Sequence, residues 1–200
     1  VSLYNESRGQ AIYPTPVVGG LGLLEDVNSH CRSGFPGDGL AVAVLGLAGW
    51  RSRSSDVAAS EYLHVIHGQV LGKPVIDLGL ESRVQELCRG SIARGIISSA
   101  HDCSEGGVLL AAAEMAFSGN LGLELTLQDE DSTGTLYFAE TPSRYLLEVA
   151  PSKVEELLSL LGDVPSCCIG EFTTSSTVCM DGCVWELKDL RGAWLEGLVI

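Results

Sequence analysis

The segment SAHDCSEGGVLLAAAEMAF, which runs from Ser99 to Phe117, joins a histidine, acidic residues and a Gly-Gly pair to a long apolar stretch. The β-branched residues just before it, Ile96 and Ile97, predict a strand, and the apolar stretch predicts a helix that begins near Glu105. Backbone N–H groups and the helix dipole favour an anion where a helix begins. The segment therefore predicts a strand-to-helix turn suited to a nucleotide or another phosphorylated ligand.

Two interpretations of this turn are open. In the first, Asp102 or Ser104 is the N-cap of the helix, and Asp102 and Glu105 form a pair that resembles a capping box. In the second, Asp102 binds a divalent cation, Ser104 contacts a phosphate oxygen, and the amides of Gly106 and Gly107 bind the same anion. Two glycines in a first helical turn cost about 1 kcal/mol each relative to alanine, which favours a site that needs close backbone approach.

The composition sets limits on the function. A chain of 200 residues of which 46% are hydrophobic can bury the core of one domain, with room for part of a second. With 26 acidic and 12 basic residues, the net charge of -14 repels a nucleic-acid backbone, so we expect no nucleic-acid partner. A phosphorylated ligand must then be held by backbone amides, a few arginines or a bridging cation, for which Mg²⁺ is suitable.

The cysteines and the apolar runs indicate the cellular setting. The seven cysteines lack the paired C-x-x-C spacing of a zinc site, so we expect most of them to be reduced, buried apolar residues. The nearest approach to metal spacing, Cys179 and Cys183, has no second ligand pair. No apolar run reaches the ~18 residues needed to cross a bilayer, and no signal peptide opens the chain. We therefore expect a cytoplasmic protein without a membrane partner.

The first part of the chain predicts a change of domain. It starts abruptly at Val1 and is interpreted as a fragment of a longer protein. The segment Ile12–Val27 predicts an edge or terminal strand, with an apolar part, Val17–Leu24, that would be exposed at a seam between two halves. The turn-rich residues 33–39 then precede the buried type of strand at Leu40–Gly46. We place the domain boundary there, between residues 1–33 and 34–200.

The rest of the chain alternates helices and strands without a strict βαβ repeat, which predicts an α+β fold with a mixed sheet. The predicted helices cover residues 56–70, with Gly68 as the stop, 77–94, 105–118 and 151–161. The predicted strands cover residues 96–100, 121–127, 143–150 and 167–173, followed by a hairpin over 177–187; residues 129–134 predict an acidic loop.

The chain resembles a known family. Residues 100–120, AHDCSEGGVLLAAAEMAFSGN, resemble the HD-x-S-[DE]-GG-L…AEMAF-x-G block of the phosphoribosylformylglycinamidine synthases, which belong to the PurM-like ATP-dependent superfamily. Residues 1–7, VSLYNES, and 12–27, IYPTPVVGGLGLLEDV, resemble the opening of the same region of these enzymes. Further matches are Ala59–Leu63, Tyr137–Arg144 and Ile169–Glu171, so the resemblance covers nearly the whole chain in order.

The resemblance implies a fold and an activity. Residues 34–200 would form a PurM C-terminal-domain-like mixed β-sheet flanked by helices, preceded in residues 1–33 by the last strand segment of a PurM N-terminal-type domain. Enzymes of this family are ATP-dependent C–N ligases of purine biosynthesis. They phosphorylate the formamide oxygen of formylglycinamide ribonucleotide, and ammonia from glutamine then displaces the phosphate to give the amidine. The isolated chain would be inactive, since it corresponds to part of the second half of such an enzyme.

The resemblance also assigns ligands to residues. It implies Mg²⁺ and ATP, or ADP as a bound structural nucleotide, and it gives no catalytic residue within this chain. The matched positions are Ser2 for substrate, Asp102 for the metal, and His101, Ser104, Gly106 and Gly107 for the nucleotide. A hydrogen-bonded structural role for His101 is open as well. The implied partners are the remaining domains of the synthase, a glutaminase subunit, a small accessory subunit and the small-molecule substrate.

Other residues have ordinary interpretations. Arg144 could contact phosphate, but a surface ion pair with Glu140 is the commoner outcome. His64 and His67 lie three residues apart on a predicted helix without a third ligand, which favours surface positions over a metal site. Glu61 is given no chemical role.

Two other functions are open. One is a different enzyme of the superfamily, such as an aminoimidazole ribonucleotide synthase or a selenophosphate synthetase. The Tyr4-Asn5-Glu6 and Pro14-Thr15-Pro16 motifs argue against it. The other is a structural pairing domain that binds no nucleotide.

Overall fold

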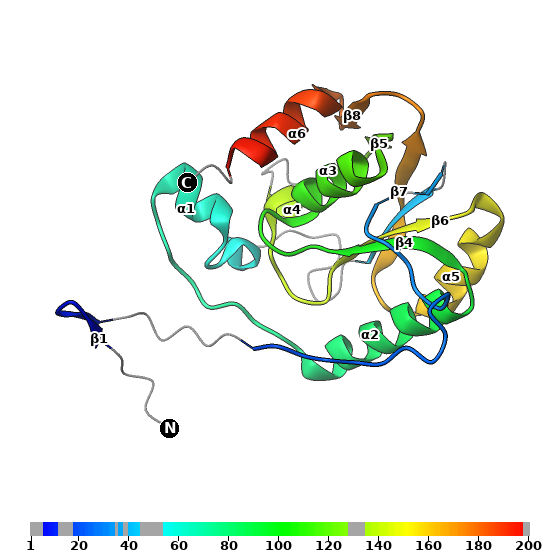
Figure 1. The fold of residues 1–200 in the computed structure, drawn as a ribbon, viewed down its shortest axis with the longest axis horizontal. Helices are drawn as coiled ribbons and strands as arrows, with labels where there is room; N and C mark the ends of the chain where they lie inside the picture. Colours follow the sequence, from blue (N-terminus) through cyan, green and yellow to red (C-terminus); the bar gives the residue numbers. More distant parts are fainter. Residues whose placement is uncertain are drawn as a thin grey trace.

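The computed structural model describes residues 6–11, 18–34, 36–37, 40–44, 54–127 and 135–197. Within these residues a seven-stranded sheet carries helices on both faces (Figure 1). Its strands are β3 (Leu40–Val44), β4 (Ile97–Asp102), β5 (Gly122–Leu125), β6 (Tyr145–Val149), β7 (Ser166–Thr173), β8 (Thr177–Met180) and β9 (Cys183–Glu186), and a separate exposed hairpin consists of β1 (Glu6–Ser7) and β2 (Gln10–Ala11).

The helices alternate with these strands along the chain. They are η1 (Ser54–Val57), α1 (Glu61–His67), α2 (Leu78–Ala93), α3 (Gly107–Gly119), α4 (Thr135–Phe138), η2 (Pro151–Lys153), α5 (Val154–Leu161) and α6 (Leu187–Glu196). Within the described part of the chain, every helix is too short or too polar to span a bilayer.

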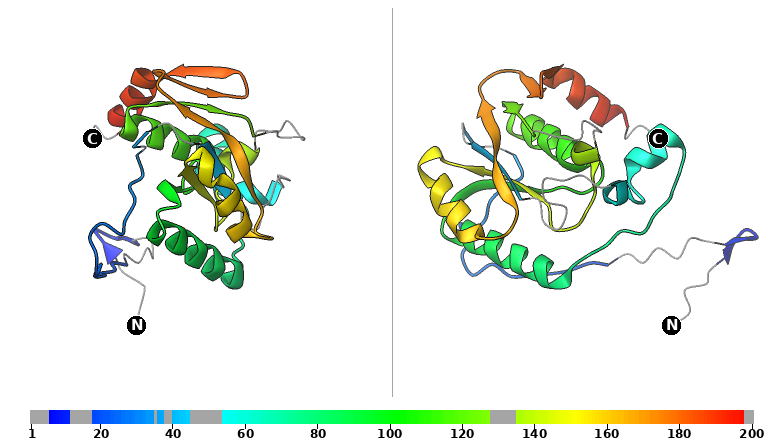
Figure 2. Two further views of the ribbon diagram at one scale, coloured as in Figure 1. Left: turned by 90° about the vertical axis from the view of Figure 1, so that its right-hand side faces the viewer. Right: turned by 180° about the vertical axis from the view of Figure 1, so that it is seen from behind.

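The strand order of the sheet is β4-β6-β3-β7-β5-β8-β9. All neighbouring strands are antiparallel except β5 and β8, which are parallel. Helices α3 and α6 cover one face, and α2 and α5 cover the other, as the two further views show (Figure 2). The mixed sheet confirms the predicted α+β class, and it places the carboxyl end of β4 directly before the start of α3.

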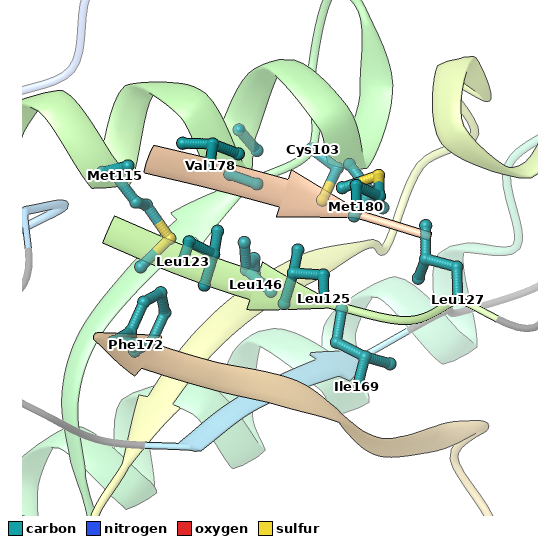
Figure 3. Close-up of a cluster of buried hydrophobic side chains, with 14 of the residues drawn as sticks. Cys103, Met115, Leu123, Leu125, Leu127, Leu146, Ile169, Phe172, Val178 and Met180 are labelled. Carbon is teal, nitrogen blue, oxygen red and sulfur yellow. The ribbon is translucent and has the colours of Figure 1, made fainter. Parts of the chain in front are cut away.

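The alternation of side chains along the strands divides the core into two clusters. On β6, Leu146 packs in the cluster beneath α3, while its neighbour Leu147 packs in the cluster beneath α2 and α5. Met115 of α3 lies over Leu123 and Phe172 in the first cluster (Figure 3). Because both clusters are built on β6, the two helical layers are fixed relative to each other through the sheet.

Local sequence signals explain where α1 and α2 begin and end. The Asp77 carboxylate accepts from the backbone N–H groups of the first turn of α2, as an N-cap does. Gly68 ends α1 with a φ of 63°, a left-handed conformation that glycine adopts readily. These features confirm the predicted helix over 77–94 and the stop at Gly68. Helix α1 begins at Glu61 rather than at Asp56, because Ser60 is its N-cap.

The start of α3 differs from the capping-box interpretation. The N-cap is Gly106, which has a φ of 78° and supplies no side chain to cap the helix. Asp102 ends β4, and Ser104 and Glu105 lie in the connecting turn. The prediction of Asp102 or Ser104 as N-cap is therefore wrong, because the left-handed glycine itself turns the chain into the helix without a capping side chain of its own.

Gly107 has a steric reason to be glycine. Its φ is 66°, and a Cβ there would lie 2.6 Å from the carbonyl oxygen of Tyr137 and 2.8 Å from that of Ala139. The first turn of α3 thus packs directly on the backbone that follows α4.

The N-terminal segment differs from its prediction. Of the predicted strand Ile12–Val27, residues 12–17 lie outside the described residues, and residues 18–27 form no strand. The side chains of Val18, Leu21 and Leu23 are 88%, 101% and 98% exposed, so their exposure agrees with the predicted seam. A strand needs a pairing partner for its backbone groups, and no described neighbour supplies one here.

The cysteines are less buried than predicted. Cys88 and Cys103 are buried, Cys31 and Cys179 are half-buried, and Cys168 and Cys183 are exposed. The prediction of buried cysteines is therefore wrong for most of the described ones, which lie near strand ends and on the edge hairpin.

The register of the β8–β9 hairpin decides whether its two cysteines can bind one zinc ion. In the β8–β9 register, Cys179 lies opposite Val184 and Cys183 lies opposite Met180. Since residues opposite each other share a face of the sheet, Cys179 and Cys183 point to different faces. The pair therefore forms no metal site, as expected.

Replacement of Gly107 by alanine tests the packing at the start of α3. We expect Gly107→Ala to lower the free energy of unfolding by about 3 kcal/mol, because the positive φ and the nearby carbonyl oxygens both oppose a Cβ. Gly90 in α2 has open space around its Cα, so Gly90→Ala should stabilise by up to ~1 kcal/mol. Urea denaturation of both variants measures the difference, and equal effects would contradict this account.

Candidate functional site

A cavity of about 400 Å³ lies beyond the carboxyl end of β4. Its walls come from the turn Asp102–Ser104, the loop Glu140–Tyr145 and, on α2, Glu81 and Gln85. The predicted metal residue and one predicted nucleotide residue thus share one cavity with a loop nearly forty residues downstream. A larger cavity of about 680 Å³, beside residues 30–36 and the end of α3, contains none of the predicted site residues.

Asp102 and Ser104 present oxygen ligands to the cavity. The Asp102 side chain is 65% exposed, and its carboxylate accepts a hydrogen bond from the Ser104 hydroxyl. Among the described residues, no group of three or more His, Cys, Asp or Glu side chains is placed to hold a metal. The residues present therefore fit a cation such as Mg²⁺, which binds through one carboxylate together with water and ligand phosphates, and do not form an all-protein cage.

The amides of the glycine pair already have acceptors within the chain. The Gly106 N–H donates to Glu140 Oε1 at 2.8 Å, and the Gly107 N–H donates to the Ser104 carbonyl at 3.1 Å. Both glycines are buried. An anion can reach the Gly106 amide only if the Glu140 carboxylate moves away. Close packing accounts for Gly107 without a ligand.

Glu140 is the residue whose role the sequence did not show. Its Oε1 accepts from the Gly106 N–H and also from the Glu61 N–H at 2.9 Å, so one carboxylate oxygen serves the starts of α3 and α1. Negative charge is favourable at helix N-termini, which explains an acid in this position. The predicted ion pair of Glu140 with Arg144 is wrong, because the carboxylate takes these two backbone donors instead.

Arg144 is buried rather than on the surface. It is 2% exposed, and its guanidinium donates to the Ala139 carbonyl at 2.8 Å and to the Leu136 carbonyl at 3.2 Å. Burial lowers the pKa of Arg144, while the nearby Cys103 and Asp56 act in the opposite direction. Its Nε and the Thr141 hydroxyl are buried and have no hydrogen-bond partner among the described residues. The arginine therefore holds the backbone of the loop that lines the cavity.

His101 faces away from the cavity. Its Nε2 lies 3.1 Å from Glu114 Oε2 on α3, and its Nδ1 lies 2.7 Å from the Asp102 carbonyl oxygen. Glu114 Oε1 in turn accepts from the Trp194 indole N–H at 3.1 Å. Because neighbours on a strand point to opposite faces, Asp102 reaches the cavity and His101 reaches α3. His101 therefore does not line the cavity, although its Nδ1 lies 3.7 Å from Asp102 Oδ1.

His64 and His67 do not line this cavity, and the predicted substrate residue cannot be placed. Ser2 lies outside the described residues. His64 lies 3.5 Å from the Glu61 carboxylate on the surface of α1, and His67 packs edge-on against Tyr62. Their surface positions agree with the interpretation that they are not metal ligands.

The matching family model and the similar known sequences indicate related families. A family model described as "AIR synthase related protein, C-terminal domain" matches residues 35–180. The chain is 44% identical to the phosphoribosylformylglycinamidine synthase subunit PurL of Moorella thermoacetica over 161 residues, which are 80% of this chain and 21% of that protein. Its match to the Nostoc punctiforme PurL subunit is 38% identical over 211 aligned positions, with coverages of 94% and 26%. The chain thus spans about a quarter or less of the length of these relatives.

Solved structures share the fold. T. maritima PurL complexed with FGAR aligns with a TM-score of 0.62 and 18% identity, covering 80% of this chain and 29% of that one. T. maritima PurL complexed with ADP gives 0.58 and 17%, with coverages of 80% and 26%. The E. coli hydrogenase maturation protein HypE gives 0.55 and 18%, with coverages of 78% and 51%. These likenesses confirm the predicted PurM C-terminal-like fold.

Substitution of Glu140 tests its role at the two helix starts. Glu140→Ala removes the acceptor of the Gly106 and Glu61 amides, and we expect it to lower the free energy of unfolding by about 1–3 kcal/mol. Glu140→Gln keeps an acceptor oxygen of the same reach and should cost about 1 kcal/mol or less. Urea denaturation measures both. If both variants lose the same free energy of unfolding, the acceptor oxygen of residue 140 does not stabilise the starts of α1 and α3.

The buried thiol of Cys103 predicts a loss of stability at alkaline pH. Burial raises the pKa of Cys103 from 9.0 to about 12. The stability contributed by the protonated thiol is complete below pH 9 and declines as the pH rises toward 12, because the unfolded chain ionises first. One such proton gives a slope of about 1.4 kcal/mol per pH unit.

Denaturation at pH 7, 9.5 and 11 tests this expectation. Cys103→Ala should make the alkaline decline shallower by about that slope. Ala112→Gly, which changes a buried residue that does not ionise, should destabilise by a similar amount at every pH. An unchanged slope in Cys103→Ala would contradict the assignment.

Proposed function

Because the chain belongs to the family of AIR synthase related proteins, C-terminal domain, we propose that it works as a domain of a phosphoribosylformylglycinamidine synthase. The relatives named as the PurL subunit of that enzyme support this function, since they match most of the chain. The proposed reaction is the ATP-dependent conversion of formylglycinamide ribonucleotide and ammonia to the amidine. The chain covers a small share of these relatives, so it would act together with further domains and have no turnover by itself.

We propose that the cavity at the end of β4 is the nucleotide pocket of this domain. The observation that carries the proposal is the pairing of an exposed carboxylate, Asp102, with the Ser104 hydroxyl at the wall of a cavity of about 400 Å³. Asp102 would hold Mg²⁺. The Ser104 hydroxyl, which donates to Asp102 in this structure, would turn to a phosphate oxygen once the metal occupies the carboxylate. When bound, the metal would neutralise phosphate charge in a protein whose net charge is -14.

The Gly106 and Gly107 amides have a conditional role in this pocket. Movement of the Glu140 carboxylate would free the Gly106 N–H for a phosphate at the start of α3. The Gly107 N–H keeps its bond to the Ser104 carbonyl and positions the turn. His101 would act on the nucleotide only through Asp102.

The remaining parts of the proposal concern partners and domains. The T. maritima structure described as PurLQS shows a relative assembled with further components. We propose that a glutaminase subunit supplies ammonia and that a small accessory subunit joins the assembly. Ser2 would contact substrate. The boundary between residues 33 and 34 would separate the end of an N-terminal-type domain from the C-terminal-type domain.

A structural pairing domain without nucleotide is the second candidate. The observation in its favour is that both glycine amides have acceptors within the chain. A different enzyme of the superfamily is less well supported, because the closely matching relatives are named as PurL subunits.

Calorimetric titration with ADP and Mg²⁺ distinguishes these functions. We expect binding that disappears when EDTA removes the metal, and Asp102→Asn should weaken it at least about tenfold. The matched control is Asp189→Asn, which changes an exposed carboxylate on α6 outside the cavity and should bind like the unchanged chain. Absence of heat would favour the structural role, and equal affinity in the two variants would place nucleotide binding away from Asp102.

A further inference from the structure

A third cavity, of about 300 Å³, forms an apolar groove between α3 and α6. On the α3 side it is lined by Leu109, Leu110, Ala113 and Phe117, with Glu114 beside them; on the other side it is lined by Val178, Trp185, Leu190, Ala193 and Trp194. Figure 1 shows α3 and α6 side by side on one face of the sheet. We call this cavity the α3–α6 groove.

The groove is suited to protein side chains rather than to a metabolite. Sites for small molecules combine apolar walls with a few polar groups that orient the ligand. The one charged residue of the lining, Glu114, already binds the His101 ring and the Trp194 indole through its two oxygens. The volume is also at the lower limit of such sites, and it is enough for one or two large apolar side chains.

Large apolar side chains remain open to solvent at the groove. Leu110 is 42% exposed, Trp185 36% and Trp194 48%. Tryptophans in a hydrophobic pocket are frequent anchors of protein–protein interfaces. Trp194 also packs against Phe117 with ring centroids 5.4 Å apart, so its indole is held in place before a partner arrives.

The charges around the groove favour a basic partner. On and beside α6, the exposed acids Glu186, Asp189 and Glu196 lie three or four residues from the groove residues Leu190 and Ala193. Of the two exposed bases of this helix, Arg191 is placed in the same way, three residues from Trp194, and Lys188 is not. The whole chain carries a net charge of -14. Complementary charge accelerates encounter and selects the partner.

We propose that the α3–α6 groove is a docking surface for a protein segment that carries large apolar side chains flanked by lysine or arginine. Its apolar side chains fill the groove against Trp185 and Trp194, and its basic residues meet the acidic rim. An amphipathic helix presents side chains in this pattern.

The groove is joined to the nucleotide cavity by a continuous chain of hydrogen bonds. Trp194 donates to Glu114, the other Glu114 oxygen binds His101, and His101 bonds to the Asp102 backbone. A side chain that shifts the Trp194 indole therefore changes the surroundings of His101. The link to nucleotide binding at Asp102 rests on the proposed function, whereas docking in the groove does not.

A designed peptide tests the docking surface on the chain without nucleotide. The probe is an amphipathic helix of about 18 residues built from leucine and lysine, which makes five turns. We expect it to change tryptophan fluorescence saturably and to shift the His101 ring signals in NMR spectra. The same helix with glutamate in place of lysine should bind at least tenfold more weakly.

Two matched variants locate the binding. Leu110→Lys places a charge on the wall of the groove at an exposed position and should weaken binding of the lysine peptide at least tenfold. Val184→Lys makes the same change at a 60% exposed position outside the groove and should leave affinity within twofold. Circular dichroism confirms that both variants are folded.

Several outcomes would overturn the proposal. Equal binding of the two peptides would remove the charge selection, and unchanged affinity in Leu110→Lys would place binding elsewhere. Dimerisation of the chain that Leu110→Lys abolishes would assign the groove to a second copy. Static His101 signals during saturable binding would refute the link to Asp102. Since no nucleotide is present, none of these results bears on whether the cavity binds ADP.

Discussion

The contact of Gly107 with the backbone of residues 137–139 determines the geometry of both surfaces described above. With no Cβ, the first turn of α3 approaches the Tyr137 and Ala139 carbonyl oxygens directly. Arg144 holds the same stretch from the other side, through its bonds to the Leu136 and Ala139 carbonyls. The stretch is thus fixed between a buried guanidinium and a helix start. Its continuation, Glu140, then reaches the N–H groups that begin α3 and α1.

This arrangement gives the ligand cavity an unusual electrostatic state. A helix N-terminus attracts an anion, and in this structure the anion is the protein's own Glu140 carboxylate. A phosphate must compete with that carboxylate and must also overcome a net charge of -14. A metal on Asp102 would offset both effects, because it adds positive charge at the same cavity. Under the proposed function, binding of a phosphate ligand in this cavity would therefore depend on a divalent cation.

Elements with strong local signals could be predicted from the sequence. The Asp77 cap, the Gly68 stop, the strand before His101 and the alternating strands need only neighbouring residues to identify them. Glu140 and Arg144 could not be placed in the same way, because their partners are backbone groups brought near by tertiary folding. From the sequence alone, two opposite charges four residues apart predict a surface ion pair. Only the folded loop shows which groups they actually bind. Helix α6 went unpredicted although Leu187, Leu190 and Trp194 recur at helical spacing, a signal that the preceding hairpin obscured.

The two-residue period of β4 has a consequence that composition could not reveal. His101 and Asp102 look like one site in the sequence, yet the pleat sends them to opposite faces of the sheet. Each side chain then joins a different surface, Asp102 the cavity beside α2 and His101 the layer of α3 and α6. His101 and Asp102 are consecutive residues of a hydrogen-bonded strand, so a displacement of one residue also displaces the other. A histidine that was expected to touch the nucleotide is thereby better placed to connect the cavity beside Asp102 with the layer of α3 and α6.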